Sequence, residues 1–256
     1  MGSKRFFCDQ RNPIVQLMYL VLVVGGYGVF VLEAYPLLPN HVCPDPLHPS
    51  SPAFHPTHRI NGYIVFALCM FTFYKACMTS PGVVTKETHQ EFNVYPIDNG
   101  IYEVSACRTC KTSKVARSKH CRVCNHCVAR FDHHCIWLNQ CVGERNYKWF
   151  MSFLLVHAVL LLYGAAALCS ILCVCPLSPS SLNRHTHPVP TDTNQRVQAS
   201  YGVLFQYMMH YYTSLVGLLL LTSIMGIVLV GFLVYHIILA CNNTTTNETF
   251  KWRSLE

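Results

Sequence analysis

Charge is what this sequence has least of. Of its 256 residues only 12% are Asp, Glu, Lys or Arg, whereas 52% are hydrophobic, and about a quarter of the residues in soluble domains are usually charged. No polar stretch has the size of an ordinary soluble domain, so the composition indicates a membrane protein. A net charge of +7 is compatible with anionic lipid or a phosphate-bearing cofactor. In a membrane context we expect no nucleic acid as a partner.

Four apolar segments are long enough to cross a bilayer. The first, 14–32, carries no charge; at about 1.5 Å rise per residue it nearly crosses a hydrocarbon core of about 30 Å. Its length and the spans that follow favour an uncleaved helix over a signal peptide. The other three segments are 60–78, 149–174 and 215–240. The sequence therefore predicts an all-α membrane protein with four transmembrane helices.

Lysine and arginine are unevenly distributed among the segments between these helices. The counts are three in the N-terminus 1–13, one in the loop 33–59, ten in 79–148, two in the loop 175–214 and two in the tail 241–256. The positive-inside rule places both termini and 79–148 in the cytosol, and makes both loops lumenal, with 175–214 including the approach to the fourth helix. Glycosylation sequences agree, because all three, at Asn242, Asn243 and Asn247, lie in the tail, where glycosylation enzymes could not reach them, and the lumenal loops contain none.

Cysteine is concentrated in one segment. Seven of the fifteen cysteines lie, with four histidines, between Cys107 and Cys141, and most others are in or beside apolar runs, which argues against a disulfide scaffold. A shift of fourteen residues superimposes the pattern C-x2-C-x9-H-x6-C on itself, giving two Cys3His sets typical of structural zinc. The predicted ligands are Cys107, Cys110, His120 and Cys127 for one ion, and Cys121, Cys124, His134 and Cys141 for the other.

A second pairing of the same ligands stays open. Nearest neighbours in sequence would put Cys107, Cys110, His120 and Cys121 on one ion. The regular repeat favours the first scheme, in which the two sites interleave. Because the segment has few apolar residues of its own, we expect zinc to hold it together.

One cysteine of the cluster, Cys135, is not used by the repeat, because Leu138 stands where a C-x2-C partner would be. A thiol with a pKa near 8.5 is mostly protonated in the cytosol. Adjacent His133 can take its proton, Asp132 can orient the imidazole, and zinc-bound His134 would keep the backbone rigid. Cys135 is therefore a candidate nucleophile. A further metal ligand or an inert buried thiol is the alternative.

Asp132-His133-His134-Cys135 within this frame resembles the Asp-His-His-Cys (DHHC) family of integral-membrane protein S-acyltransferases, the palmitoyltransferases. The resemblance covers nearly the whole chain, with two spans on either side of the cysteine-rich segment. Further matches to family motifs are Ser80-Pro81-Gly82, Arg117-Ser118-Lys119-His120-Cys121, Cys141-Val142-Gly143, Asn146-Tyr147 and Thr245-Thr246-Asn247-Glu248. Ser80, Val115, Ile136 and Gln140 depart from the family pattern, and none of these changes removes a zinc ligand or a member of the Asp-His-Cys set.

This resemblance implies a two-step reaction in which 79–148 is the catalytic domain. Cys135 would take a fatty acyl group from acyl-coenzyme A (acyl-CoA), typically palmitoyl-CoA, and pass it to a cysteine of a substrate protein. The resemblance also implies the interleaved pairing of the ligands of two zinc ions, and supporting roles for Thr245 and Glu248. The expected partners are membrane lipids and proteins with cytosolic cysteines close to the membrane.

The acyl donor needs an apolar cavity for its chain and a positive surface for its phosphates. Trp137, Phe150 and Phe153 are candidates to line the cavity. The candidates to bind the phosphates are Arg108, Lys111, Lys114, Arg117, Lys119, Arg122, Arg130 and Lys148. A run of basic residues like this one is also typical of a solvated surface that sets the membrane topology.

The alternative function is a membrane zinc-domain scaffold, catalytically weak or inactive, that recruits protein partners. A ubiquitin-ligase RING would close with a second C-x2-C pair, which is missing, and a thiol oxidoreductase would need Cys107 and Cys110 free. Fairly short spans and lumenal loops without glycosylation sequences favour the endoplasmic reticulum or Golgi. The sequence thus predicts four helices with a cytosolic, zinc-bound domain between the second and the third.

Overall fold

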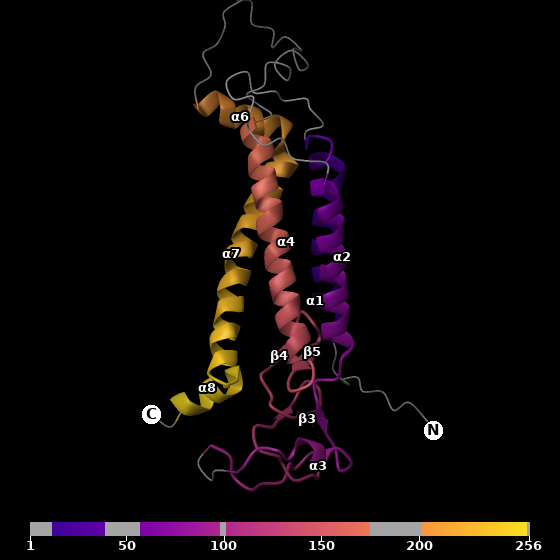
Figure 1. Ribbon diagram of the computed structural model, residues 1–256, viewed down its shortest axis with the longest axis vertical. Coiled ribbons are helices and arrows are strands. Elements are labelled where there is room, and N and C mark those ends of the chain that lie inside the picture. The colour runs from indigo at the N-terminus through magenta and orange to yellow at the C-terminus, as the bar shows by residue number, and fades with distance from the viewer. Residues whose placement is uncertain (1–11, 39–56, 98–100, 175–200, 255–256) are drawn as a thin grey trace, which may run out of the picture. The chain divides into compact units, whose positions relative to one another are not determined.

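The computed structural model of the protein describes residues 12–38, 57–97, 101–174 and 201–254 (Figure 1). Most of the predicted N-terminus and of the two predicted lumenal loops lies outside the described residues. The chain divides into two compact units. Unit 1 comprises Met1–Leu22, Leu68–Val156 and Leu229–Glu256, and unit 2 comprises Val23–Ala67 and His157–Val228.

Among the described residues, four helices are long and apolar enough to cross a membrane. Helices suit this role because every backbone N–H and C=O is satisfied inside the segment. They are α1 (Pro13–Val29), which continues into a π-helical turn (Phe30–Ala34), α2 (Thr57–Met78), α4 (Tyr147–Val174) and α7 (Thr213–Cys241). The predicted fold class is confirmed: the chain is mostly helical, and the cysteine-rich segment lies between the second and third of these helices.

Local sequence explains where the first helix begins. The side chain of Asn12 accepts a hydrogen bond from the N–H of Ile14 at 3.0 Å, which is the role of an N-cap residue. Pro13 follows at the first helical position, where its missing N–H costs nothing. A further helix, α6 (Tyr201–Tyr211), lies in the segment 175–214 and precedes α7.

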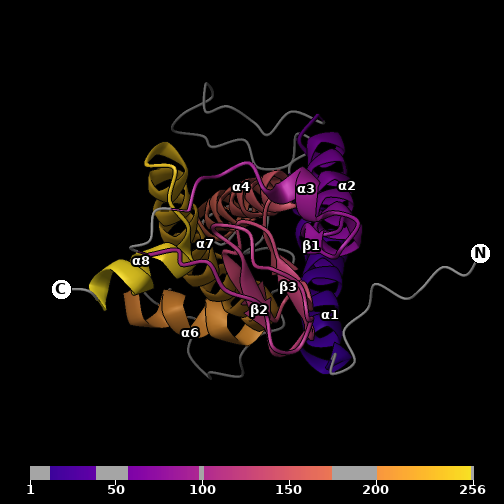
Figure 2. The same ribbon diagram turned by 90° about the horizontal axis from the view of Figure 1, so that it is seen from below.

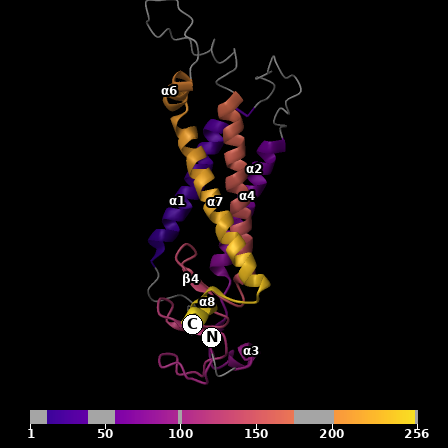
Figure 3. The same ribbon diagram turned by 90° about the vertical axis from the view of Figure 1, so that its left-hand side faces the viewer.

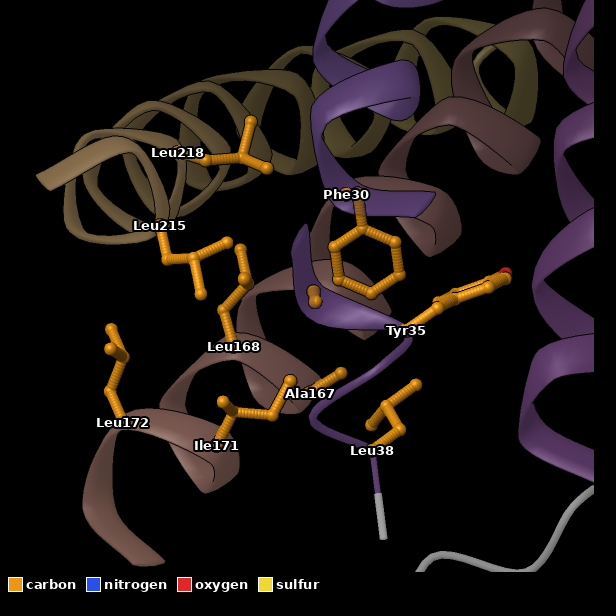
Figure 4. Close-up of a cluster of buried hydrophobic side chains, with 10 residues drawn as sticks. Phe30, Tyr35, Leu38, Ala167, Leu168, Ile171, Leu172, Leu215 and Leu218 are labelled. Carbon is orange, nitrogen blue, oxygen red and sulfur yellow. The ribbon is translucent and has the colours of Figure 1, made fainter. Parts of the chain in front are cut away.

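Unit 2 is held together by apolar packing between helices. Phe30 begins the π-helical turn and Tyr35 directly follows it, and both pack with Leu168 of α4 and Leu215 of α7 (Figure 4). Arg59 of α2 donates a hydrogen bond to the carbonyl oxygen of Tyr35 at 2.7 Å. Inside a bilayer such packing acts through close contact and hydrogen bonds rather than through release of water. The other members of the buried cluster are Ala34, Leu38, Ala167, Ile171, Leu172 and Leu218.

Unit 1 contains two small antiparallel sheets. Strands β1 (Val83–Val84), β3 (His126–Val128) and β2 (Lys119–Cys121) form the first, in the order β1-β3-β2 (Figure 2), and β4 (His133–Cys135) pairs with β5 (Gln140–Val142). A short helix, α3 (His89–Phe92), follows β1. The sheets are too short to be stable without another source of free energy.

Three copies of one hairpin occur in the described part of the cysteine-rich segment. The antiparallel pairs Ala106↔Ser113, His120↔Cys127 and His134↔Cys141 follow one another at intervals of fourteen residues. The turns repeat at the same interval, because Lys111, Asn125 and Asn139 all have positive φ, at 53°, 53° and 50°. Asparagine is one of the few residues that tolerate this left-handed conformation. The fourteen-residue ligand repeat is thus a repeat of backbone structure with a third copy.

Two family-type motifs meet where the hairpins join α2. The N–H of Ala129 donates to the carbonyl oxygen of Gly82 at 2.8 Å, and the N–H of Arg145 donates to that of Pro81 at 3.4 Å. A Cβ at Gly143 would lie 2.6 Å from the carbonyl oxygen of Pro81, so this position requires glycine. The side chain of Gln140 donates to backbone carbonyls at the end of α2. These contacts attach the sheets to the helix.

The last helix, α8 (Thr246–Arg253), begins with a capping box. The hydroxyl of Thr245 accepts from the N–H of Glu248 at 3.3 Å, and the Glu248 carboxylate accepts from the N–H of Thr245 at 2.9 Å. Two of the backbone donors that a helix start leaves unpaired are satisfied in this way. Figure 3 shows α8 following the end of α7, and the N–H of Thr246 donates to the side chain of Asp132, the residue just before β4.

Candidate active site and metal centres

The first Cys3His cluster consists of Cys107, Cys110, His120 and Cys127. The three sulfur atoms lie 3.5, 3.4 and 3.9 Å from Nδ1 of His120. A tetrahedral zinc ion with Zn–S near 2.3 Å and Zn–N near 2.0–2.1 Å separates sulfur and nitrogen by about 3.6 Å. The donor set and its spacing therefore fit zinc.

The second cluster, Cys121, Cys124, His134 and Cys141, repeats this geometry. Its sulfur atoms lie 3.8, 3.3 and 3.7 Å from Nδ1 of His134. In both clusters all four ligand atoms lie within 4.8 Å of one another. The grouping is the interleaved one, so the nearest-neighbour pairing is not the arrangement that the structure has.

The alternation of side chains along a strand explains the interleaving. Successive residues of a strand point to opposite faces, so His120 of β2 reaches the first cluster while Cys121 reaches the second. The same rule acts in β4. His134 belongs to the second cluster, and His133 and Cys135, two residues apart, share the opposite face.

His133 connects Asp132 with Cys135. Its Nδ1 lies 2.6 Å from Oδ2 of Asp132, whose side chain is 1% exposed, and its side chain lies on the same face of β4 as that of Cys135. Burial lowers the pKa of His133, but the hydrogen bond to Asp132 and the nearby Cys135 side chain outweigh burial and raise it to about 9. Burial raises the pKa of Asp132, and the hydrogen bond from His133 outweighs burial and holds it below its ordinary value. Asp132 therefore stabilises the protonated form of His133, which makes His133 a stronger base.

The start of α8 holds Asp132 in place. The N–H of Thr246 donates to Oδ1 at 2.8 Å, and its hydroxyl donates to Oδ2 at 3.1 Å. A carboxylate at a helix N-terminus is stabilised by the unpaired N–H groups and the helix dipole. The motif residues Thr245 and Glu248 support this contact indirectly through the capping box. Sequence reasoning named those two and missed Thr246, which touches the carboxylate itself.

Arg117 also binds α8, through the carboxylate of Glu248. Its Nε and Nη2 donate to the two carboxylate oxygens of Glu248 at 2.6 and 2.7 Å, and Nη2 also donates to the carbonyl oxygen of Asn243 at 2.7 Å. The Tyr102 hydroxyl donates to Glu248 as well. Burial raises the pKa of Glu248, but the bonds from Arg117 and Tyr102 outweigh burial and hold it below its ordinary value. Arg117 thus has an internal partner.

The other predicted CoA contacts fall into two groups. Lys119 donates to the side chain of Asn247 at 2.7 Å, and Arg130 donates to that of Asn243 at 3.1 Å, so both also serve the C-terminal segment. The remaining side chains are exposed or half-buried, which keeps contact with a phosphate as a prediction. They are Arg108, Lys111, Lys114, Arg122 and Lys148.

Of the three predicted cavity residues, one lies directly at the site. The ring of Phe150 is 1% exposed and its centroid is 5.2 Å from that of His133. Phe153 is buried against Phe73 one turn further along α4. Trp137 is 44% exposed, at the turn between β4 and β5. Their contact with an acyl chain stays a prediction.

His236 was missed from the sequence because it lies inside an apolar run. It is fully buried in α7, and its ring centroid is 5.8 Å from that of His133. One ligand atom each of Asp132, His133 and His236 lie within 4.8 Å of one another. A signal was present, since ionisable residues inside spanning helices commonly have functional roles.

Fold and site together define a class: a multi-pass membrane protein with zinc-type Cys3His centres and an Asp-His-Cys set whose Asp132 and Cys135 are buried. The model of the DHHC palmitoyltransferase family matches residues 100–253, which is more than half of the chain. The chain belongs to the DHHC palmitoyltransferase family.

Curated relatives agree with this membership. The chain is 33% identical to palmitoyltransferase SWF1 of Yarrowia lipolytica over 209 residues, which cover 80% of this chain and 52% of that protein. It is 35% identical to palmitoyltransferase ZDHHC4 of Rattus norvegicus over 196 residues, 74% of this chain and 55% of that one. It is 32% identical to palmitoyltransferase SWF1 of Neurospora crassa over 261 residues, 98% and 56% of the two chains. The chain spans about half the length of these relatives.

Proposed function

We propose that this protein is a protein S-palmitoyltransferase that moves a fatty acyl group from acyl-CoA to cysteine thiols of other proteins through a thioester at Cys135. One observation carries the proposal. Cys135 belongs to neither metal cluster among the described residues, and it shares one face of β4 with His133, which binds buried Asp132. A thiol, a base and a group that orients the base are the parts of nucleophilic catalysis. Membership of the family supports it.

In the first step, His133 takes the proton of the Cys135 thiol, and the sulfur attacks the carbonyl carbon of the acyl-CoA thioester. The bond from that carbon to the CoA sulfur breaks, and CoA leaves as a thiol with the proton from His133. Asp132 accepts the Nδ1–H of His133, which stabilises the transient imidazolium and leaves Nε2 to carry the moving proton. The product is an acyl thioester on Cys135.

In the second step, a cysteine thiol of the substrate protein gives its proton to His133 and attacks the same carbonyl carbon. The bond to the Cys135 sulfur breaks, and Cys135 recovers its proton. The two steps exchange one thioester for another, so little free energy is lost. Asp132, His133 and Cys135 are the proposed catalytic residues.

Two zinc ions are proposed as structural groups, one in each Cys3His cluster. Bound zinc supplies folding free energy, on the order of 10 kcal/mol for a small site, and fixes the strands on which the catalytic side chains lie. All four protein ligands are present in each cluster, as in structural rather than catalytic zinc sites. His134 would thus be bound to zinc between His133 and Cys135.

The lysine and arginine count supports a cytosolic position for both termini and for 79–148. Acyl-CoA is a cytosolic donor with an acyl chain that favours the bilayer, so a site at this boundary suits it. Proposed partners are therefore membrane lipids and proteins with cysteines close to the cytosolic membrane surface. We propose the endoplasmic reticulum or Golgi as the location. Exposed Lys148, at the start of α4, is the proposed CoA contact closest in sequence to buried Phe150.

The test is acyl transfer by the purified full chain in detergent micelles. Incubation with clickable palmitoyl-CoA should give a label on the chain that hydroxylamine removes, and a cysteine peptide added afterwards should take up that label. Release of CoA thiol, measured in parallel, should match the label formed. A chain that contains zinc in both clusters and gives neither label nor CoA release would contradict the proposed function.

A further inference from the structure

The strongest unexplained feature of the site is His236. A histidine inside a spanning helix is expensive, and His236, five residues before the end of α7, is completely buried. Its ring lies between Phe150 and Phe232, with centroid distances of 4.9 and 4.6 Å. The same two phenyl rings also flank His133, at 5.2 and 6.5 Å. The two imidazoles therefore share one apolar enclosure.

The hydrogen bonds of His236 define its tautomer. The Tyr147 hydroxyl donates to the carbonyl oxygen of His236 at 3.2 Å and lies 3.3 Å from its Nδ1. A hydroxyl has a single proton, so Nδ1 is the donor in the second contact. The neutral ring then carries its lone pair on Nε2. That atom is buried and has no hydrogen-bond partner among the described residues.

A buried acceptor without a donor is costly, and an apolar side chain of similar size would avoid the cost. The side chains of Asp132 and His133 lie close enough to the imidazole of His236 for one water to bridge them. Ligand atoms of Asp132, His133 and His236 are all within 4.8 Å of one another, and two hydrogen bonds through one water span about 5.6 Å. A water at this position would donate a hydrogen bond to Nε2 of His236 and form another with the Asp132–His133 pair.

We propose that His236 is a positioning residue for the acyl transfer. Through Nε2 and a bound water, His236 fixes the orientation of His133 relative to Asp132 and Cys135, while Tyr147 fixes His236 itself. The inference rests on the proposed function, and it adds a contact from α7 to a site otherwise built by β4 and α8. Removal of the nitrogen atoms should misplace His133 without loss of the fold.

Two substitutions separate the nitrogen atoms from the ring. His236→Phe keeps an aromatic ring between Phe150 and Phe232 but removes both nitrogens, whereas His236→Gln keeps a polar group and loses the ring. We expect His236→Phe to lower kcat of acyl-enzyme formation by about 10- to 100-fold, with an unchanged KM for palmitoyl-CoA. His236→Gln should recover most of this loss. His157→Phe, at a buried histidine in α4 that is not part of the site, is the matched control and should behave as wild type.

A second measurement does not depend on acyl transfer. The rate at which iodoacetamide alkylates Cys135, followed by mass spectrometry of its peptide, should fall in His236→Phe and recover in His236→Gln. Wild-type rates of both reactions in His236→Phe, or loss in His236→Gln alone, would show that His236 only fills space and would overturn the inference. A loss of one bound metal ion in His236→Phe would overturn it as well, in favour of a third metal site. A wild-type chain that is not acylated would count against the proposed function, and the alkylation rates would still decide the role of His236.

Discussion

The second and third hairpins of the cysteine-rich segment have the same backbone and different chemistry. In both, a histidine pairs with a cysteine seven residues later, His120 with Cys127 and His134 with Cys141. In the β2–β3 hairpin, Cys121 and Cys124 both belong to the second metal cluster. In the β4–β5 hairpin, Cys135 occupies the position of Cys121, and Leu138 occupies that of Cys124.

This difference shows how a metal-binding hairpin can present a nucleophile. Leu138 is 1% exposed and packs where a second thiolate would be, so Cys135 has no partner with which to bind a metal. The residues three and two positions before it change as well, from Ser118 and Lys119 in the second hairpin to Asp132 and His133 in the third. One backbone thus holds two zinc ligands in one copy and an Asp-His-Cys set in the next.

The largest expected effect comes from damage to the second hairpin. Cys121→Ser removes a ligand from the second cluster, and zinc at such a site contributes on the order of 10 kcal/mol to folding. We expect loss of zinc, measured by atomic absorption, and rapid proteolysis of the cysteine-rich segment. Full zinc content with a protease-resistant segment would show that Cys121 is not a ligand.

Next in size is the loss of Asp132. Asp132→Asn keeps the shape but removes the charge that stabilises the His133 imidazolium, and we expect acyl-enzyme formation to slow by about 10²- to 10⁴-fold with zinc retained. Ser118→Ala, at the corresponding position of the second hairpin, is the matched control and should stay close to wild type. Similar rates in the two variants would remove the distinction between the hairpins.

A smaller effect is expected from loss of the ion pair between Arg117 and Glu248 of α8. Arg117→Met leaves the Glu248 carboxylate buried without its arginine partner, which should lower the free energy of unfolding by about 3–5 kcal/mol. Arg253→Met is the control, because Arg253 is exposed on α8, the helix that carries Glu248, and its loss should cost little stability.

The Arg117–Glu248 ion pair also predicts a pH dependence of stability. The pKa of Glu248 is lowered by folding, so its contribution to stability is present above the unfolded value near 4.3 and is lost as pH falls through the folded value.

Thermal unfolding in detergent between pH 7 and pH 3 checks this sign. The midpoint of the wild type should fall more steeply with acid than that of Glu248→Gln, which has no proton to take up. Equal slopes would mean that folding does not lower the pKa of Glu248.

The smallest expected effect comes from a substitution that gives the third hairpin a second cysteine as a possible metal ligand. Leu138→Cys gives the third hairpin the C-x2-C pair of the second, with His133 nearby. We expect a folded protein whose acyl-enzyme formation is slowed by added zinc and recovers when the excess is removed, whereas the wild type is insensitive to the same addition. An insensitive Leu138→Cys variant would mean that the third hairpin does not share the ligand geometry of the second.

The sequence was most informative where function depends on spacing. Four apolar runs predicted the spanning helices, because length and the absence of charge suffice for that purpose. The fourteen-residue spacing predicted both Cys3His groupings, since alternate residues of a short strand face opposite sides. Cys135 was predicted by elimination, as the thiol that the repeat leaves over.

Contacts between distant segments could not be predicted. Thr246 reaches Asp132 across 114 positions of sequence, and its capping box was visible only as a motif of unexplained purpose. His236 meets His133 because α7 passes beside β4, and nothing in an apolar run specifies which of its faces will do so. Arg117 was predicted as a CoA contact from its charge, while burial beside Glu248 gives it a partner inside the protein.

The measurement that tests this account most directly compares Cys135→Ser with the wild type for both zinc content and acyl label. Clickable palmitoyl-CoA should leave a hydroxylamine-sensitive label on the wild type and none on Cys135→Ser, while both chains retain zinc in the two Cys3His clusters. Equal labelling of the two chains with zinc retained would contradict the assignment of Cys135. A loss of zinc in Cys135→Ser would make Cys135 a ligand and remove the difference between the hairpins.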